Sequence, residues 1–155
     1  MDEKASRHRG TVIERALSPE AIARCLALRV EVFIAEQGVS AADEQDGLDG
    51  AAEHWIVHRG PRTLGCARVR LLEDPADGTA YAKIQRVAVA QAGRGTGLGA
   101  RLMTAIMDDL AKRGLEARLD SQVEAVAFYE RLRFVAEGPE FMDAGIAHQH
   151  MRWRP

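Results

Sequence analysis

A glycine-rich segment at residues 93–99 directly follows an apolar, β-branched run and directly precedes a helical pattern. It reads Gly-Arg-Gly-Thr-Gly-Leu-Gly, so it combines four glycines with the guanidinium of Arg94. Glycine lets the backbone approach a ligand without a Cβ in the way. The start of a helix offers unpaired N–H groups and the positive end of the helix dipole. Together these features predict a binding site for a pyrophosphate.

Two other phosphate-binding patterns have to be compared with this segment. A Walker P-loop requires Gly-Lys-Ser or Gly-Lys-Thr after its glycines, whereas Gly97 is followed by Leu98 and Gly99. The dinucleotide-binding fingerprint Gly-x-Gly-x-x-Gly/Ala fits residues 95–100, and Asp120 stands where a ribose-binding acid is expected. However, residues 91–94 separate the fingerprint from the preceding strand, and too few residues follow Asp120 to complete that fold. NAD binding and a glycine-rich turn without a ligand stay open as alternatives.

The composition is that of one ordinary domain. The chain has 155 residues, of which 46% are hydrophobic, enough for one compact core. The net charge of -2 argues against a general nucleic-acid-binding protein. No apolar run is long enough to cross a bilayer, and the polar N-terminus lacks the apolar stretch of a signal peptide. We expect a cytoplasmic protein with residues 1–10 disordered and residues 11–155 folded as a single domain.

No metal site is expected from the histidines and cysteines. Four histidines form two pairs that lack a third ligand at a recognised spacing: His54 with His58, and His148 with His150. Cys25 and Cys66 have no Cys-x-x-Cys partner, so we interpret them as reduced, buried side chains. Cys66 also lacks a neighbouring histidine, which argues against a role as a nucleophile.

Hydrophobic periodicity defines the elements that must position the glycine-rich segment. The first helix is expected to begin with Ser18 and Pro19 and to end at Gly38, and an acidic loop follows over residues 40–52. A second helix begins within the glycine-rich segment and ends before Gly114, and a third covers residues 124–132. Strands are expected over residues 11–17, 53–59, 64–72, 81–90, 115–119, 134–137 and 146–153. The order β-α-β-β-β-α-β-α-β-β predicts an α+β fold with a mixed sheet.

Residues 94–99 resemble the Arg/Gln-x-x-Gly-x-Gly/Ala motif of the GCN5-related N-acetyltransferases, the GNAT family. Residues 84–89 are similar to the family's central strand, and residues 122–134 are similar to its later Asn-x-x-Ala-x-x-Phe-Tyr-Glu-x-x-Gly-Phe signature. Two spaced motifs in the correct order are more specific than either alone. Residues 28–39, 43–49 and 144–151, together with His54, further resemble the small bacterial acetyltransferases of the ElaA/YjcF type.

The resemblance implies the GNAT fold, in which helices flank a central, mixed, mostly antiparallel sheet. It also implies acetyl-CoA as the donor, a primary amine of a small molecule as the acceptor, and direct attack of that amine on the thioester. The sequence leaves the oligomeric state open, and a homodimer is the commonest assembly for such enzymes. The residues that the resemblance places at the donor are Val87, Ala88, Val89, Arg94, Gly95, Thr96, Gly97, Leu98, Gly99, Gln122, Phe128 and Tyr129.

The reaction needs a proton for the departing thiolate, a polarised carbonyl and a neutral amine. Tyr129 is the expected proton donor, because a phenol has a pKa of about 10 and a thiol about 8.5. The backbone N–H of Val87 on the central strand is expected to polarise the carbonyl. The candidates for the general base are Glu36, Asp46, His54 and His148, of which His148 and Glu36 are favoured. The candidate acceptor contacts are Arg29, Glu36, Asp46, His54, Arg86 and His148.

Two positions depart from the family pattern. Gln122 replaces the usual asparagine and keeps an amide with a longer reach. Arg133 replaces the usual glycine, so a positive φ at this position would introduce local strain. Neither change removes a group that the reaction needs, although a CoA-binding sensor without turnover remains the alternative function. The acidic residues 43–46 weakly favour a cationic amine such as a polyamine or an aminoglycoside.

Overall fold

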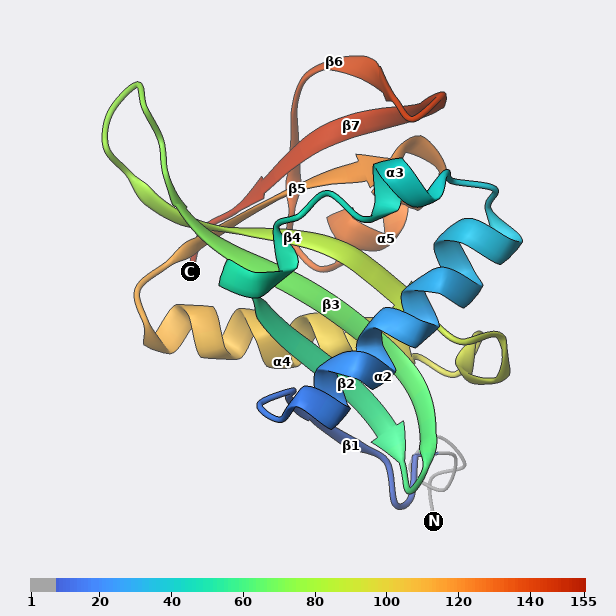
Figure 1. Ribbon diagram of the computed structural model, residues 1–155. Helices are drawn as coiled ribbons and strands as arrows, with labels where there is room; N and C mark the ends of the chain where they lie inside the picture. Colours follow the sequence, from blue (N-terminus) through green and yellow to red (C-terminus); the bar gives the residue numbers. More distant parts are fainter. Residues whose placement is uncertain (1–7) are drawn as a thin grey trace.

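Seven strands form one mixed sheet in the order β1-β2-β3-β4-β5-β7-β6 in the computed structural model, which describes residues 8–155 (Figure 1). Their bounds are β1 Val12–Arg15, β2 Glu53–Arg59, β3 Arg62–Glu73, β4 Ala80–Val89, β5 Glu116–Gln122, β6 Val135–Asp143 and β7 Ile146–Trp153. The predicted α+β fold with a mixed sheet is confirmed. Strand β6 extends well beyond the predicted residues 134–137, because it pairs with β7 as far as Asp143.

Helices cover both faces of this sheet. The longer ones are α2 Pro19–Arg29, the π-helix η1 Val30–Glu36, α4 Leu98–Lys112 and α5 Val126–Arg131; the shorter ones are α3 Ala41–Glu44, η2 Asp49–Ala51, η3 Gln91–Gly93 and η4 Val123–Ala125. The Ser18 side chain caps α2 by accepting from the backbone N–H of Ala21 at 3.1 Å, as its sequence predicts. Where one continuous α-helix was expected, the backbone widens to a π-helix from Val30 onward.

The N-terminal segment predicted to be disordered is described only in part. Residues 8–10 form a turn that the Thr11 N–H closes by donating to the His8 carbonyl at 3.0 Å. Residues 1–7 lie outside the described part of the chain. No helix within residues 8–155 is both long enough and apolar enough to cross a membrane.

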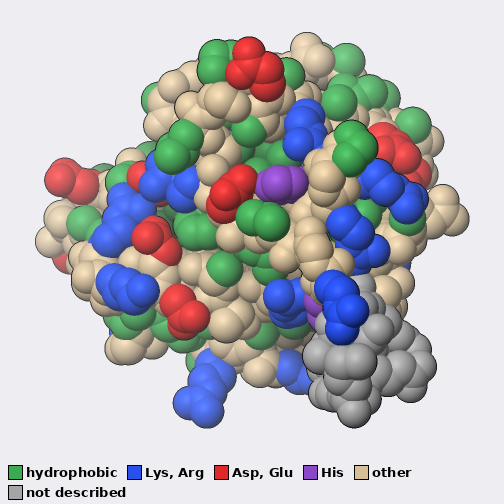
Figure 2. Space-filling view, turned by 90° about the horizontal axis from the view of Figure 1, so that it is seen from below, with side chains coloured by type: hydrophobic (Ala, Val, Ile, Leu, Met, Phe, Trp, Pro, Cys, Tyr) green, Lys and Arg blue, Asp and Glu red, His purple; other side chains and the backbone are tan. Residues whose placement is uncertain are grey.

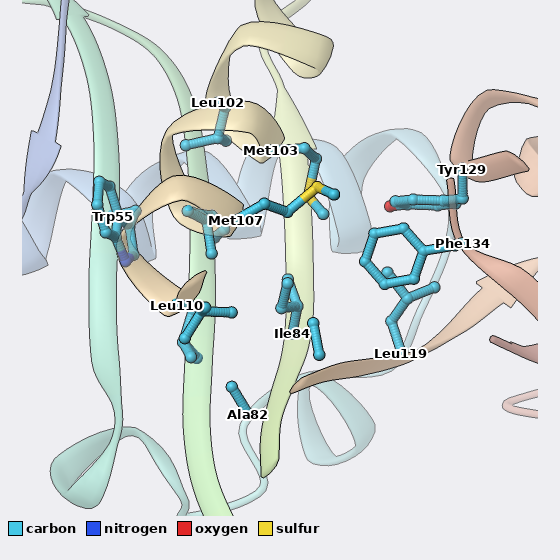
Figure 3. Close-up of a cluster of buried hydrophobic side chains, with 14 of the residues drawn as sticks. Trp55, Ala82, Ile84, Leu102, Met103, Met107, Leu110, Leu119, Tyr129 and Phe134 are labelled. Atoms are coloured by element: carbon cyan, nitrogen blue, oxygen red, sulfur yellow. The ribbon is translucent and has the colours of Figure 1, made fainter. Parts of the chain in front are cut away.

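Two hydrophobic clusters lie on opposite faces of the sheet. The larger cluster packs α4 and α5 onto one face; Figure 3 shows Leu102, Met103 and Met107 of α4 near Trp55 and Ile84 of the sheet. The smaller cluster packs α2 onto the other face and contains Cys25, Ile56 and Cys66. Because successive strand residues face opposite sides, Trp55 and Ile56 supply one side chain to each cluster. Both cysteines are free and buried, as predicted.

The sheet is split in its middle, and this split creates the site. Strands β4 and β5 are parallel, and their pairing covers only Tyr81–Lys83 against Glu116–Arg118. Beyond Lys83 and Arg118 the two strands separate. On the far side of the split, β7 lies between β5 and β6 and is antiparallel to both.

Candidate active site

A cavity of about 540 Å³ occupies the split between β4 and β5. Residues 83–87 of β4 form one wall, and residues 119–122 of β5 form the other. Tyr129 of α5 and His148 of β7 also line the cavity, as do residues 43, 44 and 46 of the acidic loop. Segments that are far apart in sequence therefore meet where the sheet opens.

The glycine-rich segment lies directly after β4. Gly95 and Gly97 have φ values of +74° and +83°, a conformation that side chains with a Cβ rarely adopt. Gly97 is the N-cap of α4, and no side chain in the described part of the chain caps this helix end. The Thr96 hydroxyl donates to the Gly93 carbonyl at 2.6 Å and fixes the turn. The first N–H groups of α4 are thus free to bind an anion, which is the chemistry that the sequence predicts for this segment.

Arg94 is already held by the protein on both sides of its guanidinium. Its Nε donates to the Val89 carbonyl at 3.0 Å, and its Nη2 lies 2.6 Å from Oε2 of Glu36. Glu36 was expected to act as a base or to contact the acceptor. Instead it is paired with the predicted pyrophosphate arginine and does not line the cavity. Glu36 therefore lies beside the glycine-rich segment and not on the cavity.

A β-bulge interrupts β4 where the carbonyl-polarising N–H was predicted. Cys66 pairs with Ala88 and Arg68 pairs with Gln85, so Arg86 and Val87 together oppose the single residue Ala67. Arg86 has a φ of +54°, which is rare for a residue with a side chain. Val87 lines the cavity immediately after this distortion, with the regular ladder disrupted beside it.

Tyr129 places a phenol in the cavity. The residue is only 9% exposed, and its ring packs edge-on against Phe128 at 5.0 Å and Phe134 at 5.9 Å between centroids. Figure 3 shows its hydroxyl pointing away from α5 toward β4. Burial raises the pKa of Tyr129 to about 12, so the hydroxyl stays protonated at neutral pH. Within residues 8–155 it has no hydrogen-bond partner, which leaves its proton available to a ligand in the cavity.

His148 presents an imidazole to the same cavity. Its Nδ1 lies 2.7 Å from the Ile146 carbonyl, and its ring stacks on Phe141 at a centroid distance of 5.9 Å. A carbonyl accepts only, so Nδ1 carries the proton when the ring is neutral. Nε2 is then the basic nitrogen, in the form that a general base requires.

Two of the predicted acceptor contacts are corrected by the structure. Arg29 is 1% exposed, and its guanidinium binds Glu44 and Asp49 at 2.7 Å each. His54 is 3% exposed, and its Nε2 lies 2.9 Å from the Asp49 carbonyl. Both side chains bind residues of the acidic segment 40–52, and neither lines the cavity.

The acidic loop is largely neutralised by arginines rather than open to a cation. Arg68, which is fully buried, donates to both carboxylate oxygens of Asp46 at 2.8 Å. This guanidinium holds the pKa of Asp46 well below its usual range, so Asp46 is a poor general base. Arg86 lines the cavity, but its guanidinium is directed at Glu44 and Asp46. The basis for favouring a cationic amine is therefore weaker than the sequence indicates.

The remaining predicted donor residues lie around the split in different ways. The Ala88 side chain faces the α2 cluster and the Leu98 side chain lies in the main core, so both can offer only backbone groups to a ligand. A Cβ on Gly99 would lie 3.5 Å from Phe128, so this glycine marks the contact between α4 and α5. The Gln122 amide donates to the Gln37 side chain at 3.1 Å across the cavity mouth.

Sequence reasoning did not assign Lys83 to the site and considered Asp120 only as the ribose-binding acid of a dinucleotide fold, yet both line the cavity. Lys83 and Asp120 are paired at 3.1 Å, and Asp120 also holds Nδ1 of His150 at 2.8 Å. The signal was present, because Lys83 and Gln85 alternate with apolar residues along a central strand. Such alternation indicates that one face of the strand meets solvent or a ligand.

The surface carries no extended patch of one sign on the face that Figure 2 shows. Basic and acidic side chains there are interspersed with apolar ones. Within residues 8–155 no three His, Cys, Asp or Glu side chains are grouped so that they could hold a metal ion.

Comparison with known proteins gives concordant matches. A family model described as an acetyltransferase (GNAT) domain matches residues 13–155. The uncharacterized N-acetyltransferase YjcF of Bacillus subtilis is 35% identical over 138 residues, covering 88% of this chain and 94% of YjcF.

Two solved structures extend this likeness. An acyl-CoA N-acyltransferase from Pseudomonas aeruginosa is 30% identical, with a TM-score of 0.76 that covers 92% of this chain and 97% of that chain. Escherichia coli ElaA is 24% identical, with a TM-score of 0.77 over 92% of this chain and 98% of ElaA, which is a likeness of fold.

Proposed function

Because this chain belongs to the GNAT acetyltransferase family, we propose that it transfers the acetyl group of acetyl-CoA to a primary amine of a small molecule. The observation that carries the proposal is the cavity in the split sheet. At this cavity a protonated, unpaired Tyr129 hydroxyl and an imidazole of His148 face the same space. A fold kept only to bind CoA has no need of either group.

The donor end of the cavity fits the proposed co-substrate. The uncapped start of α4 and the guanidinium of Arg94 together suit a pyrophosphate, since both bind anions. Beyond Lys83 and Arg118, β4 and β5 no longer pair with each other, and the edges that face across the split suit the amide groups of a pantetheine arm. The acetyl group is proposed to lie beside Val87, whose N–H would polarise its carbonyl.

The proton transfers are assigned to two side chains. His148 takes a proton from the attacking amine, directly or through one water, through its free Nε2. The amine nitrogen forms a bond to the acetyl carbon as the carbon–sulfur bond breaks. Tyr129 gives its proton to the leaving thiolate, and burial keeps the phenol protonated until that step. The products are an N-acetylated amine and free CoA.

A thiol-release assay against a panel of amines tests the proposal. We expect release of CoA with at least one small primary amine, and we expect Tyr129→Phe to lower kcat by about 100-fold or more with acetyl-CoA affinity unchanged. Tight acetyl-CoA binding without turnover on any amine would instead support the CoA-binding sensor. A thermal-shift comparison of CoA with NAD separates both from a dinucleotide-binding protein.

We propose that the protein acts in the cytoplasm as a homodimer. Two free, buried cysteines suit a reducing compartment. Val135, Phe141 and Met142 expose apolar side chains along the edge strand β6, where a second copy could cover them. Sedimentation at several protein concentrations tests the assembly, and a monomer throughout would overturn it.

A further inference from the structure

We propose that Glu44 is a positioning residue whose buried carboxylate holds Arg86 in the left-handed conformation of the β4 bulge and thereby aims the Val87 N–H into the cavity. The inference rests on the proposed acetyl transfer, because it concerns how the group that polarises the carbonyl is held in place. Glu44 belongs to α3, far from β4 in sequence, so only the fold brings the two together.

The conformation of Arg86 needs an external support. Its φ of +54° lies in the region where a Cβ clashes with the following carbonyl, and the bulge depends on this residue. Among the residues of β4, Arg86 alone has this conformation within the described chain. The next residue, Val87, takes its orientation from the distortion.

The contacts of the Arg86 guanidinium supply that support. Its Nε lies 2.8 Å from Oε2 of Glu44, and its Nη2 donates to the backbone carbonyls of Asp43 and Glu44 at 3.2 and 3.3 Å. The contact between Nε and Oε2 is an ion pair without hydrogen-bond geometry, and the three contacts together hold the side chain against one short helix. The Arg86 backbone is thereby tied to α3 across the cavity floor.

Glu44 is itself held rigidly. Its side chain is 3% exposed, and its other oxygen, Oε1, accepts from Arg29 at 2.7 Å. The Ser40 hydroxyl accepts from the Asp43 N–H at 3.1 Å and caps α3. The neighbouring Asp46 also accepts from Nη2 of Arg86, at 3.3 Å, but its two oxygens bind Arg68 more closely, at 2.8 Å each. Glu44 is thus a carboxylate between two guanidiniums, one structural and one at the bulge.

A double-mutant cycle tests this role. We expect Glu44→Gln to lower kcat by about tenfold, less than the complete loss of such a donor, with the KM for acetyl-CoA unchanged. We expect Arg86→Gly to retain several-fold more kcat than Arg86→Ala, because glycine adopts a positive φ without support. In the Arg86→Gly background, Glu44→Gln should then cost little further kcat.

The outcomes separate the possible failures. If Glu44→Gln lowers kcat equally in both backgrounds, Glu44 acts by another route and the proposal is wrong. Equal kcat values for Arg86→Ala and Arg86→Gly would overturn it as well, and that comparison does not require the Glu44 variant to fold. If the unaltered protein turns over no amine at all, the proposed function fails first. The cycle is then read from the melting temperature alone, and an equal effect of Glu44→Gln on the melting temperature in both backgrounds refutes the bulge argument.

Discussion

Replacing Arg133 by glycine should stabilise the protein. Arg133 follows α5 with a φ of +75°, at the position where the family signature has glycine. Its N–H donates to the Glu130 carbonyl at 2.9 Å, so the backbone is fixed in this conformation. The side chain is exposed and makes no hydrogen bond or ion pair within residues 8–155, so its removal loses no such contact.

The size of the effect follows from two opposing terms. Relief of the left-handed conformation contributes about 1–2 kcal/mol. The greater freedom of glycine in the unfolded chain costs about 0.4–1 kcal/mol. The net gain is therefore about 1 kcal/mol, which raises the melting temperature of a chain of this size by about 2–4 °C.

Thermal and urea unfolding of the two proteins measure this gain. Arg101→Gly is the matched control, because Arg101 is an exposed arginine within α4 and glycine there should lose up to about 1 kcal/mol. If Arg133→Gly leaves the melting temperature unchanged or lowers it, Arg133 is not strained and the reasoning from its φ is refuted.

Three further predictions concern the site and its support. With Tyr129 holding its proton up to a pKa of about 12, kcat should not fall between pH 8 and 10; a decline there would show that another acid titrates. Glu36→Gln removes the carboxylate that pairs with Arg94, so calorimetry at low salt should find acetyl-CoA bound about 3–10-fold more tightly. Binding of S-acetyl-pantetheine, which lacks the pyrophosphate, should be unchanged. Gly93→Ala should cost about 1–3 kcal/mol of unfolding free energy, because its Cβ would lie 2.9 Å from the Leu98 side chain. Gly50→Ala, which meets nothing within 4 Å, is its control, and equal melting temperatures would contradict the clash.

Local patterns predicted the elements well because those elements follow local rules. The Ser18 cap, the amphipathic α4 and the glycine-rich turn before it are all encoded within a few residues of sequence. The position of β7 between β5 and β6 depends on contacts across the chain, and periodicity alone does not determine it.

The candidate site was predicted unevenly for the same reason. The motif that carries Tyr129 is contiguous, so the sequence located this residue on the cavity. Arg29 and His54 are polar residues on apolar faces. Their partners Glu44 and Asp49 lie in the short helices α3 and η2, in a segment whose sequence shows no periodicity and was expected to be a loop. A sequence pattern does not distinguish a polar residue that contacts a ligand from one that binds an internal partner. Arg29 and His54 are buried, and both bind internal partners.

The central place of β7 constrains the order in which the sheet can assemble. Strand β6 is made before β7, yet within residues 8–155 its sheet neighbour is β7 alone. Until residues 146–153 leave the ribosome, β6 cannot dock and the edge of β5 stays open. Strands β1 to β4, by contrast, pair antiparallel with neighbours in chain order and can form a four-stranded sheet early. The half-sheet of β5, β7 and β6, which carries His148, is therefore expected to form last. Nascent chains halted before residue 146 should expose the unpaired edge of β5, which is prone to aggregation.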